Sequence, residues 1–520
     1  MRNLVAGIGL VCGQVWAQGL PVRLANTFEF RLAEGRAEVE WVSASTFRFA
    51  RSWGAPPRSA GPIKDTTVAV TMEDLGARVR FRTRYLTVEV GKDAGRLEIK
   101  ANDGPLTTTT VRREGASVAL ESTVAASERF YGLGSRRTPN LDLRGSLIEA
   151  TKPFLISSAG YGEYFRAPGP YTFDLAASRP DRRRTTVPGD RVDYFFYYGP
   201  TPKEILEEHL GAAGEIEDFG SADLAIRKPK GKAAGQVSWE ELRATAYAFQ
   251  HESLSATLAP SFDLSRYDAA GGALLARAAQ LAAFIPTLYA SPGESLRWRA
   301  RLIPYLVAYG YEARVRGTPL IHPLAMQFPK DAVAARHSDE FMVGDEMLVA
   351  PVLGPEENVR VYLPQGIWTD LRTDEVHKGR QEITVRAAPD QIPIFTRNGT
   401  ILPLAAEIPG GPMELHYFPK LGAEFFLYEE ELGEVSQVHA APAGEFLRLE
   451  TESLQERTYE WIVHHTPECR KVMLGETELA RVEARARPAP GTWYYDPAGE
   501  RLHVMVRAAA RGDEIVNISF

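Results

Sequence analysis

The chain has 520 residues, of which 44% are hydrophobic and 24% are charged, and its formal net charge is −7. This composition is typical of a large globular protein, and at about 150 residues per domain the length corresponds to roughly three or four domains. The sequence has no long basic block. Nucleic acid and anionic membranes are therefore not expected as partners.

The first 17 residues have the pattern of a secretory signal, with a charge at Arg2, an apolar run over 4–16 and a small residue at Ala17. We expect cleavage after Ala17, which would make the mature protein periplasmic or secreted. The alternative is a buried N-terminal strand or helix. Cleavage would also remove Cys12 and leave Cys469 alone, so that neither an internal disulfide nor a cysteine metal site could form.

Residues 19–214 contain short stretches of alternating hydrophobic and polar residues, separated by Gly, Pro and Asp turns. This pattern predicts an antiparallel β-sandwich. Its expected strands include residues 47–49, 79–81, 86–90 and 97–99. A basic segment, Lys228-Pro-Lys-Gly-Lys232, indicates a solvated linker before residue 238.

The central part of the chain predicts helices joined by a short strand. Ser238-Trp-Glu-Glu241 has the spacing of a capping box and predicts a helix from Trp239 through Ala248. The apolar run 253–260 predicts a buried strand that delivers Asp263 to a loop. A second helix is expected over 271–284.

A third helix is expected after a second capping box, Ser291-Pro-Gly-Glu294. Its predicted buried stripe consists of Leu296, Ala300, Ile303 and Val307. The remainder of the chain predicts two compact β-sandwiches, with strands that include 425–428 and 502–506.

Three stretches carry a family resemblance: residues 301–331, DEFMVGDEMLVAPVL (339–353) and DQIPIFTRNGTILPL (390–404). They resemble the end of the catalytic barrel and the adjoining sandwich of glycoside hydrolase family 31, the α-glucosidase and α-xylosidase family. ERFYGLGSRRTPNLDLRG, KPFLISSAGYGEYF and DYFFYYGPTPKEILEEH are similar to its N-terminal sandwich.

The resemblance implies a multidomain, β-rich α/β fold. The expected parts are a signal peptide (1–17), a galactose-mutarotase-like N-terminal β-sandwich (19–214), a partial (β/α)8-type barrel (215–319), and proximal (320–404) and distal (405–520) C-terminal β-sandwiches. Residues 215–319 number 105, whereas a complete barrel takes about 250. We therefore expect a truncated barrel.

The resemblance also directs attention to a substrate site. SATLAPSFDLSRYD is similar to a family motif and aligns Asp263 with its Asp, which implies sugar binding by Asp263; the alternative is an exposed loop residue. The family's catalytic motifs are absent. Ala234-Gly235-Gln236 aligns with the acid/base motif but has no Asp, and Thr287–Ser291 lacks the family's substrate-binding His. Trp368-Thr-Asp370 does not match the nucleophile motif.

Other charged clusters favour structural roles. Glu240 and Glu241 suit a helix N-terminus, and Asp181-Arg-Arg-Arg184 suits a solvated loop. Glu429-Glu-Glu431 indicates an acidic turn rather than a calcium site. The adjacent His464 and His465 lie in a strand-like run, where they would face opposite ways and could not share a metal ion. No metal or cofactor is expected.

Three functions remain open from the sequence. The first is binding of an α-glucoside or α-xyloside carbohydrate with catalysis lost. The second is a retaining-type α-glycosidase whose carboxylates, such as Asp263, have been recruited into a remodelled site. The third is a structural subunit that forms a homo-oligomer through the open edge of the truncated barrel.

Overall fold

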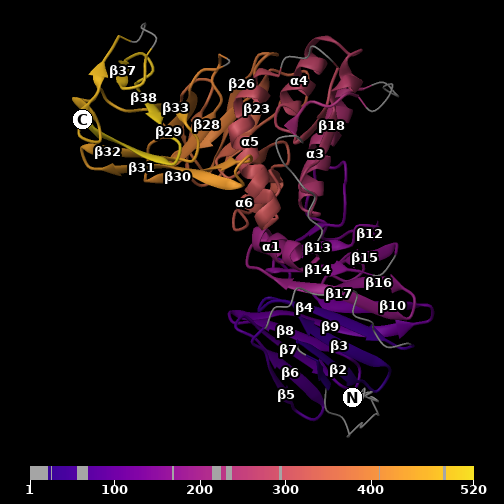
Figure 1. The fold of residues 1–520 in the computed structure, drawn as a ribbon. Coiled ribbons are helices and arrows are strands. Elements are labelled where there is room, and N and C mark those ends of the chain that lie inside the picture. Colours follow the sequence, from indigo (N-terminus) through magenta and orange to yellow (C-terminus); the bar gives the residue numbers. More distant parts are fainter. Residues whose placement is uncertain are drawn as a thin grey trace, which may run out of the picture. The chain divides into compact units, whose positions relative to one another are not determined.

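A computed structural model describes residues 22–24, 26–54, 68–166, 169–213, 224–229, 237–291, 296–408, 410–483 and 488–520. The predicted signal peptide and Ala234-Gly235-Gln236 lie outside these ranges. The chain divides into two compact units (Figure 1). Unit 1 comprises Met1–Ser127, Gly145–Thr151 and Glu163–Tyr198, and unit 2 comprises Glu128–Arg144, Lys152–Gly162 and Gly199–Phe520. Among the described residues, no helix is both long and apolar enough to cross a membrane.

Unit 1 is built from antiparallel sheets, as the alternating sequence pattern predicts. One sheet runs in the order β1 (Val22–Leu24), β2 (Thr27–Arg31), β3 (Arg36–Trp41), β4 (Thr46–Ser52), β17 (Arg191–Tyr198). The other runs in the order β12 (Leu147–Ala150), β15 (Tyr171–Leu175), β16 (Arg182–Pro188), β10 (Ser117–Thr123), β9 (Gly104–Glu114), β8 (Leu97–Ala101), β7 (Leu86–Gly91), β6 (Arg78–Arg82), β5 (Thr71–Asp74). The four strands expected from the sequence lie within β4, β6, β7 and β8 and are confirmed.

Unit 1 also holds a buried ion pair that contradicts a sequence prediction. Arg183 was expected in a solvated loop, but it lies in β16 and is only 1% exposed. Its guanidinium donates two hydrogen bonds to the buried Glu163 carboxylate, with Nη1 2.8 Å from Oε2. Strand alternation turns Arg183 inward between two exposed or half-exposed arginines, and a run of charges in the sequence does not reveal this alternation.

The central helices and strands of unit 2 agree only partly with the sequence prediction. Helix α3 (Trp239–Ser253) begins as predicted, with Glu241 N donating to the Ser238 hydroxyl at 3.2 Å. The predicted strand over 253–260 is wrong, because α3 continues to Ser253. The hydroxyls of Ser253 and Ser255 donate to the carbonyls of Gln250 and His251 and so satisfy the end of the helix.

A strand does form, but it begins at Ser261, after the predicted range. This strand, β18 (Ser261–Asp263), pairs in parallel with β19 (Thr287–Tyr289). Between them in the sequence lie a 3-10 helix, η1 (Leu264–Tyr267), and the predicted second helix, α4 (Gly272–Ala282). Arg227 forms an isolated parallel bridge with Tyr289. Between residues 224 and 291, the described chain thus contains two short parallel strands.

The predicted buried stripe of the third helix is confirmed only in part: Leu296 is buried in the core, and Ile303 and Val307 pack against it. Helix α5 (Arg297–Arg316) has Leu296 at its N-cap, and residues 292–295, which include most of the predicted capping box, lie outside the described ranges. Ala300 is exposed, and Ile303 and Val307 are half-buried. The fully buried face consists instead of Leu302, Tyr305, Leu306 and, near the end of the helix, Ala313. The sequence pattern failed because Tyr305 and Tyr309 were not counted among the apolar residues of the buried face.

The C-terminal half of unit 2 consists of paired sheets. One sheet has the order β20 (Ile321–Pro323), β21 (Phe341–Val343), β22 (Met347–Val349), β27 (Ile394–Arg397), β24 (Ile367–Asp370), β25 (Val376–Lys378). A separate two-stranded antiparallel sheet consists of β23 (Asn358–Leu363) and β26 (Gln381–Arg386). Two six-stranded sheets follow. The first has the order β28 (Thr400–Leu404), β29 (Met413–Phe418), β33 (Arg457–Val463), β38 (Arg501–Ala508), β37 (Thr492–Asp496), β36 (Ala480–Arg481). The second has the order β30 (Ala423–Glu429), β31 (Glu434–Ala443), β32 (Phe446–Ser453), β39 (Gly512–Ser519), β34 (Lys471–Leu474), β35 (Thr477–Glu478). The predicted strands 425–428 and 502–506 lie within β30 and β38.

One hydrophobic core extends through the central helices and the last two sheets, from Leu224 to Ile518. Helix α5 connects them: the rings of Tyr305 and Tyr309 lie 5.8 and 6.0 Å from that of Phe425 in β30. Helix α5 therefore packs against the distal sandwich.

Candidate functional site

A site is expected at the carboxyl ends of β18 and β19, because barrel enzymes carry their active sites at the carboxyl ends of their strands. Asp263 is the last residue of β18. Its Oδ1 accepts hydrogen bonds from Ser265 N at 3.2 Å and from Ser265 Oγ at 2.6 Å, so that Asp263 caps η1. The structure therefore gives Asp263 a local structural role.

A small ionic cluster lies at the start of α3. Glu241 forms ion pairs with Arg137 at 2.7 Å and with Arg266 at 3.2 Å. Partial burial acts to raise the pKa of Glu241, but the two arginines outweigh it and lower that pKa. Glu241 is thus a fixed anion rather than a proton donor, and its neighbour Glu240 is exposed. Both residues fit the helix-terminus role expected from the sequence.

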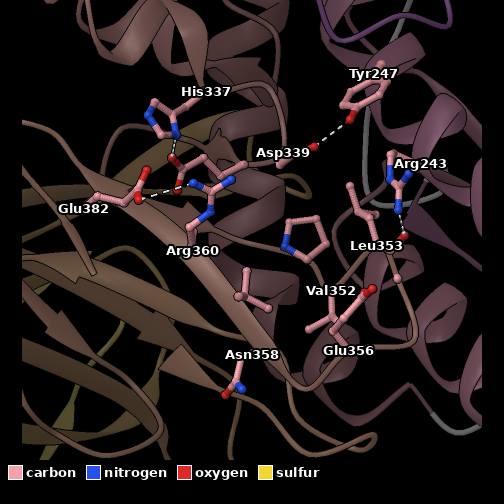
Figure 2. Close-up of a pocket in the computed structure, with 14 residues that line it drawn as sticks. Arg243, Tyr247, His337, Asp339, Val352, Leu353, Glu356, Asn358, Arg360 and Glu382 are labelled. Carbon is pink, nitrogen blue, oxygen red and sulfur yellow. Dashed lines mark hydrogen bonds and ion pairs between the residues drawn. The ribbon is translucent and has the colours of Figure 1, made fainter. Parts of the chain in front are cut away.

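A cavity of about 410 Å³ lies between α3 and the sheets that follow it (Figure 2). Its lining consists of Arg243, Tyr247, His337, Asp339, Glu340, Pro351, Val352, Leu353, Gly354, Glu356, Asn358, Val359, Arg360 and Glu382. Most of these side chains are polar, and both signs of charge are present. Such a lining suits a ligand with many hydroxyl groups, which can both donate and accept hydrogen bonds.

Two adjacent carboxyl groups in this cavity have different environments. Tyr247 donates its hydroxyl to Asp339 Oδ1 at 2.6 Å. Glu340 is only 2% exposed; its Oε1 accepts from Tyr362 N at 3.0 Å, whereas its Oε2 is buried with no hydrogen-bond partner. Burial raises the pKa of Glu340 well above its usual range. Burial thus favours the neutral form of Glu340, which is the form that a general acid needs, although His337 Nδ1 lies 3.4 Å from Glu340 Oε1.

Asp339 and Glu340 open the stretch 339–353, which carries part of the family resemblance, but the sequence did not predict them as site residues. A signal was present in the two adjacent acids that directly precede the apolar strand 341–343. A carboxyl group directly before a buried strand can itself be buried, and the loss of water around it raises its pKa.

The remaining acidic candidates have structural partners. Asp370 is 1% exposed, accepts a hydrogen bond from Arg372 N at 2.9 Å and pairs with the Arg372 guanidinium at 3.1 Å. Glu429 pairs with Arg457 at 2.9 Å and accepts from the Ser436 hydroxyl at 2.7 Å. These contacts occupy the Glu429 carboxylate, so the structure supports neither a catalytic Asp370 nor a calcium site at Glu429.

The two adjacent histidines contradict the sequence prediction. Strand β33 ends at Val463, and His465 adopts a left-handed backbone with φ of 47°. Because strand alternation stops before them, His464 and His465 do not face opposite ways. His464 Nδ1 and His465 Nε2 both approach Asp374 Oδ1, at 3.3 and 3.5 Å.

Comparisons with known proteins show which proteins this chain resembles. Residues 317–402 match the model of the glycosyl hydrolase family 31 C-terminal domain. The fold resembles a Flavobacterium johnsoniae GH31 dextranase complexed with glucose, with a TM-score of 0.78, 15% identity and coverage of 96% of this chain and 100% of that chain. It also resembles a GH31 α-xylosidase from Xanthomonas citri, with a TM-score of 0.68, 11% identity and coverage of 85% and 96%.

Proteins with similar sequences include an alpha-glucosidase and a glucosyltransferase. Alpha-glucosidase 2 of Bacillus thermoamyloliquefaciens is 29% identical over 208 residues, which are 35% of this chain and 26% of that protein. A 1,6-alpha-glucosyltransferase of Sporosarcina globispora is 35% identical over 114 residues, which are 21% of this chain and 9% of that protein. Residues 317–402 thus match a domain of glycoside hydrolase family 31, and the fold of the chain resembles that of GH31 enzymes. Its matches span about a quarter or less of these two curated relatives.

Proposed function

We propose that this protein is a carbohydrate-binding member of family 31 in which hydrolysis of α-glycosides has been lost. One observation carries the proposal: the strand-end carboxylate that aligns with the family motif, Asp263, caps its own loop through Ser265. Retaining hydrolysis needs two carboxyl groups about 5 to 5.5 Å apart, a nucleophile and an acid/base. Among the residues of β18 and β19 themselves, Asp263 alone carries a carboxyl group.

The cavity of Figure 2 is the proposed binding site for an α-glucoside or α-xyloside. Its arginines and carboxylates can donate to and accept from sugar hydroxyls. Members of the same family supply the ligand class: one neighbouring dextranase is complexed with glucose, and a variant of it with isomaltotriose. The truncated barrel is part of this proposal, because loss of strands would remove the family's substrate pocket.

A second function is favoured by one specific feature of the same cavity. Glu340 is buried, burial raises its pKa, and it lies next to Asp339, whose carboxylate accepts a hydrogen bond from the Tyr247 hydroxyl. A carboxyl group with a raised pKa can act as a general acid. Under this alternative, Glu340 would protonate the leaving group of an α-glycoside, and hydrolysis would proceed at a remodelled site away from the strand ends.

We expect the purified protein to show only background turnover of aryl α-glucosides and α-xylosides. Calorimetric titration with isomaltotriose should show saturable binding, weakened at least tenfold by Arg243→Ala, because Arg243 lines the cavity. The matched control is Arg314→Ala, outside this cavity. Turnover abolished by Glu340→Gln would establish the alternative enzyme, and turnover abolished by Asp263→Asn would establish a strand-end site. Concentration-dependent assembly without glycan binding would favour a structural subunit.

Export is also part of the proposal, and the pattern of the first 17 residues supports it. We expect protein recovered from the native host to begin near Gln18 and to appear in the periplasmic or secreted fraction. N-terminal sequencing checks this expectation. Recovery of protein that still begins with Met1 from the cytoplasmic fraction would contradict it.

A further inference from the structure

We propose that Asp374, His464 and His465 form a binding site for one divalent transition-metal ion, with Zn²⁺ the best match. The site lies in unit 2, where the turn after β24 meets the end of β33. It is distinct from the cavity of Figure 2 and does not depend on the proposed carbohydrate function.

The spacing of the three ligand atoms is the first argument. Asp374 Oδ1 lies 3.3 Å from His464 Nδ1 and 3.5 Å from His465 Nε2, and all three atoms lie within 4.8 Å of one another. A tetrahedral zinc ion with bonds of about 2.0 to 2.1 Å separates its ligand atoms by about 3.3 to 3.4 Å. The two measured separations therefore match two edges of a zinc tetrahedron. The fourth position is open to water or another ligand.

The hydrogen-bond chain behind His464 is the second argument. Arg301 pairs with the Glu414 carboxylate, whose Oε2 lies 2.8 Å from His416 Nε2. A carboxylate can only accept, so His416 Nε2 carries a proton, and in the neutral ring Nδ1 is an acceptor. His464 Nε2 lies 3.0 Å from His416 Nδ1 and must donate to it.

This chain fixes the tautomer of His464. With the proton on Nε2, the lone pair of His464 Nδ1 points toward Asp374 Oδ1, which is also an acceptor. Two acceptors 3.3 Å apart repel unless a cation lies between them. A ligating histidine with its other nitrogen donating to a neighbouring group is the usual arrangement around protein-bound zinc.

His465 and Arg501 complete the site. His465 Nε2 is buried and makes no hydrogen bond, although Asp374 Oδ1 is nearby. Arg501 binds the other oxygen, Asp374 Oδ2, at 2.8 Å and leaves Oδ1 free to bind a metal. Asp374 and His465 both have positive φ, 63° and 47°. Such backbone is uncommon for residues other than glycine and is often found where side chains are held for function.

The test uses untagged protein, because a polyhistidine tag would bind zinc itself. After EDTA treatment and dialysis, calorimetric titration with ZnCl₂ should give one site with micromolar or tighter affinity, and Zn²⁺ should raise the melting temperature by several degrees. Co²⁺ should give the visible absorption of a tetrahedral complex. His465→Ala and Asp374→Asn should each weaken zinc binding at least tenfold.

The matched control is His439→Ala, a histidine in β31 outside the cluster, which should bind zinc like the original protein. Absence of zinc binding, or binding unchanged in both His465→Ala and Asp374→Asn, would overturn the proposal. NMR of the metal-free protein gives an independent readout: an imidazolium at His464 near pH 7 would show that a proton, not a metal ion, separates the two acceptors. If His465→Ala misfolds, His465→Gln gives the same comparison.

Discussion

Replacing Leu306 with Asp should unfold unit 2 under mild conditions. Leu306 is 0% exposed and belongs to the core shared by α5 and the distal sandwich. An unpaired carboxylate there has no compensating hydrogen bond, and we expect a loss of about 4 kcal/mol or more in the free energy of unfolding. Such a loss is a large part of the 5 to 15 kcal/mol typical of a folded domain. Urea unfolding followed by circular dichroism measures it.

The same helix supplies the controls. Val315 is 55% exposed, so Val315→Asp should change the free energy of unfolding by about 0.5 kcal/mol or less. Ile303→Asp should fall between the two variants, because Ile303 is half-buried. If Leu306→Asp gives no soluble protein, Leu306→Ala should still lose about 2 to 5 kcal/mol. A Leu306→Asp protein that unfolds at the original urea concentration would contradict this description of the core.

Replacing Arg299 with Ala should lower the free energy of unfolding nearly as much, because it removes hydrogen bonds to buried carbonyl groups. The buried Arg299 guanidinium donates hydrogen bonds to the carbonyls of Leu224, Ile285 and Pro286, at 2.6 to 3.1 Å. Burial lowers the pKa of Arg299 to about 10, which leaves it charged near pH 7. The variant would strand three carbonyl oxygens in the core, and we expect a loss of about 3 to 5 kcal/mol.

Thermal and urea unfolding of Arg299→Ala can be compared with those of Arg316→Ala. Arg316 lies at the exposed end of α5 and pairs with Glu312 at 3.3 Å, which is a surface interaction worth about 1 kcal/mol or less. Arg299→Lys should give an intermediate loss, since an ammonium group reaches fewer carbonyls than the planar guanidinium. Equal stability of the Arg299→Ala and Arg316→Ala proteins would show that the carbonyl network does not stabilise unit 2.

Local patterns predicted the local structure of this protein well. Alternation identified β6 and β8, in which buried residues alternate with more exposed ones, and it also identified β7 and β4, although every residue of β4 is buried. The spacing of Ser238 and Glu241 identified the start of α3, because a capping hydrogen bond depends only on neighbours in sequence. The prediction of a strand at 253–260 was wrong, because a short apolar run does not distinguish a strand from the end of a helix.

The sites were harder to predict because they depend on partners far apart in the chain. The alignment of Asp263 with a family motif could not show that Ser265 takes up its carboxylate. Asp374 and His464 are 90 residues apart, and no sequence period links them. Their meeting follows from where β33 ends, and strand ends are the least predictable feature of a sequence.

The shared core of unit 2 also bears on how such a chain could have arisen. A (β/α)8 barrel encloses its own core, so removal of several strands would ordinarily expose apolar surface to water. Here the helices beside β18 and β19 share their core with the distal sandwich, through contacts such as those of Tyr305 and Tyr309 with Phe425. If barrel strands are missing, as proposed, that shared burial would cover apolar surface that they would otherwise cover. It also ties residues 237–316 to the sandwiches, so that neither part is free to be inherited alone.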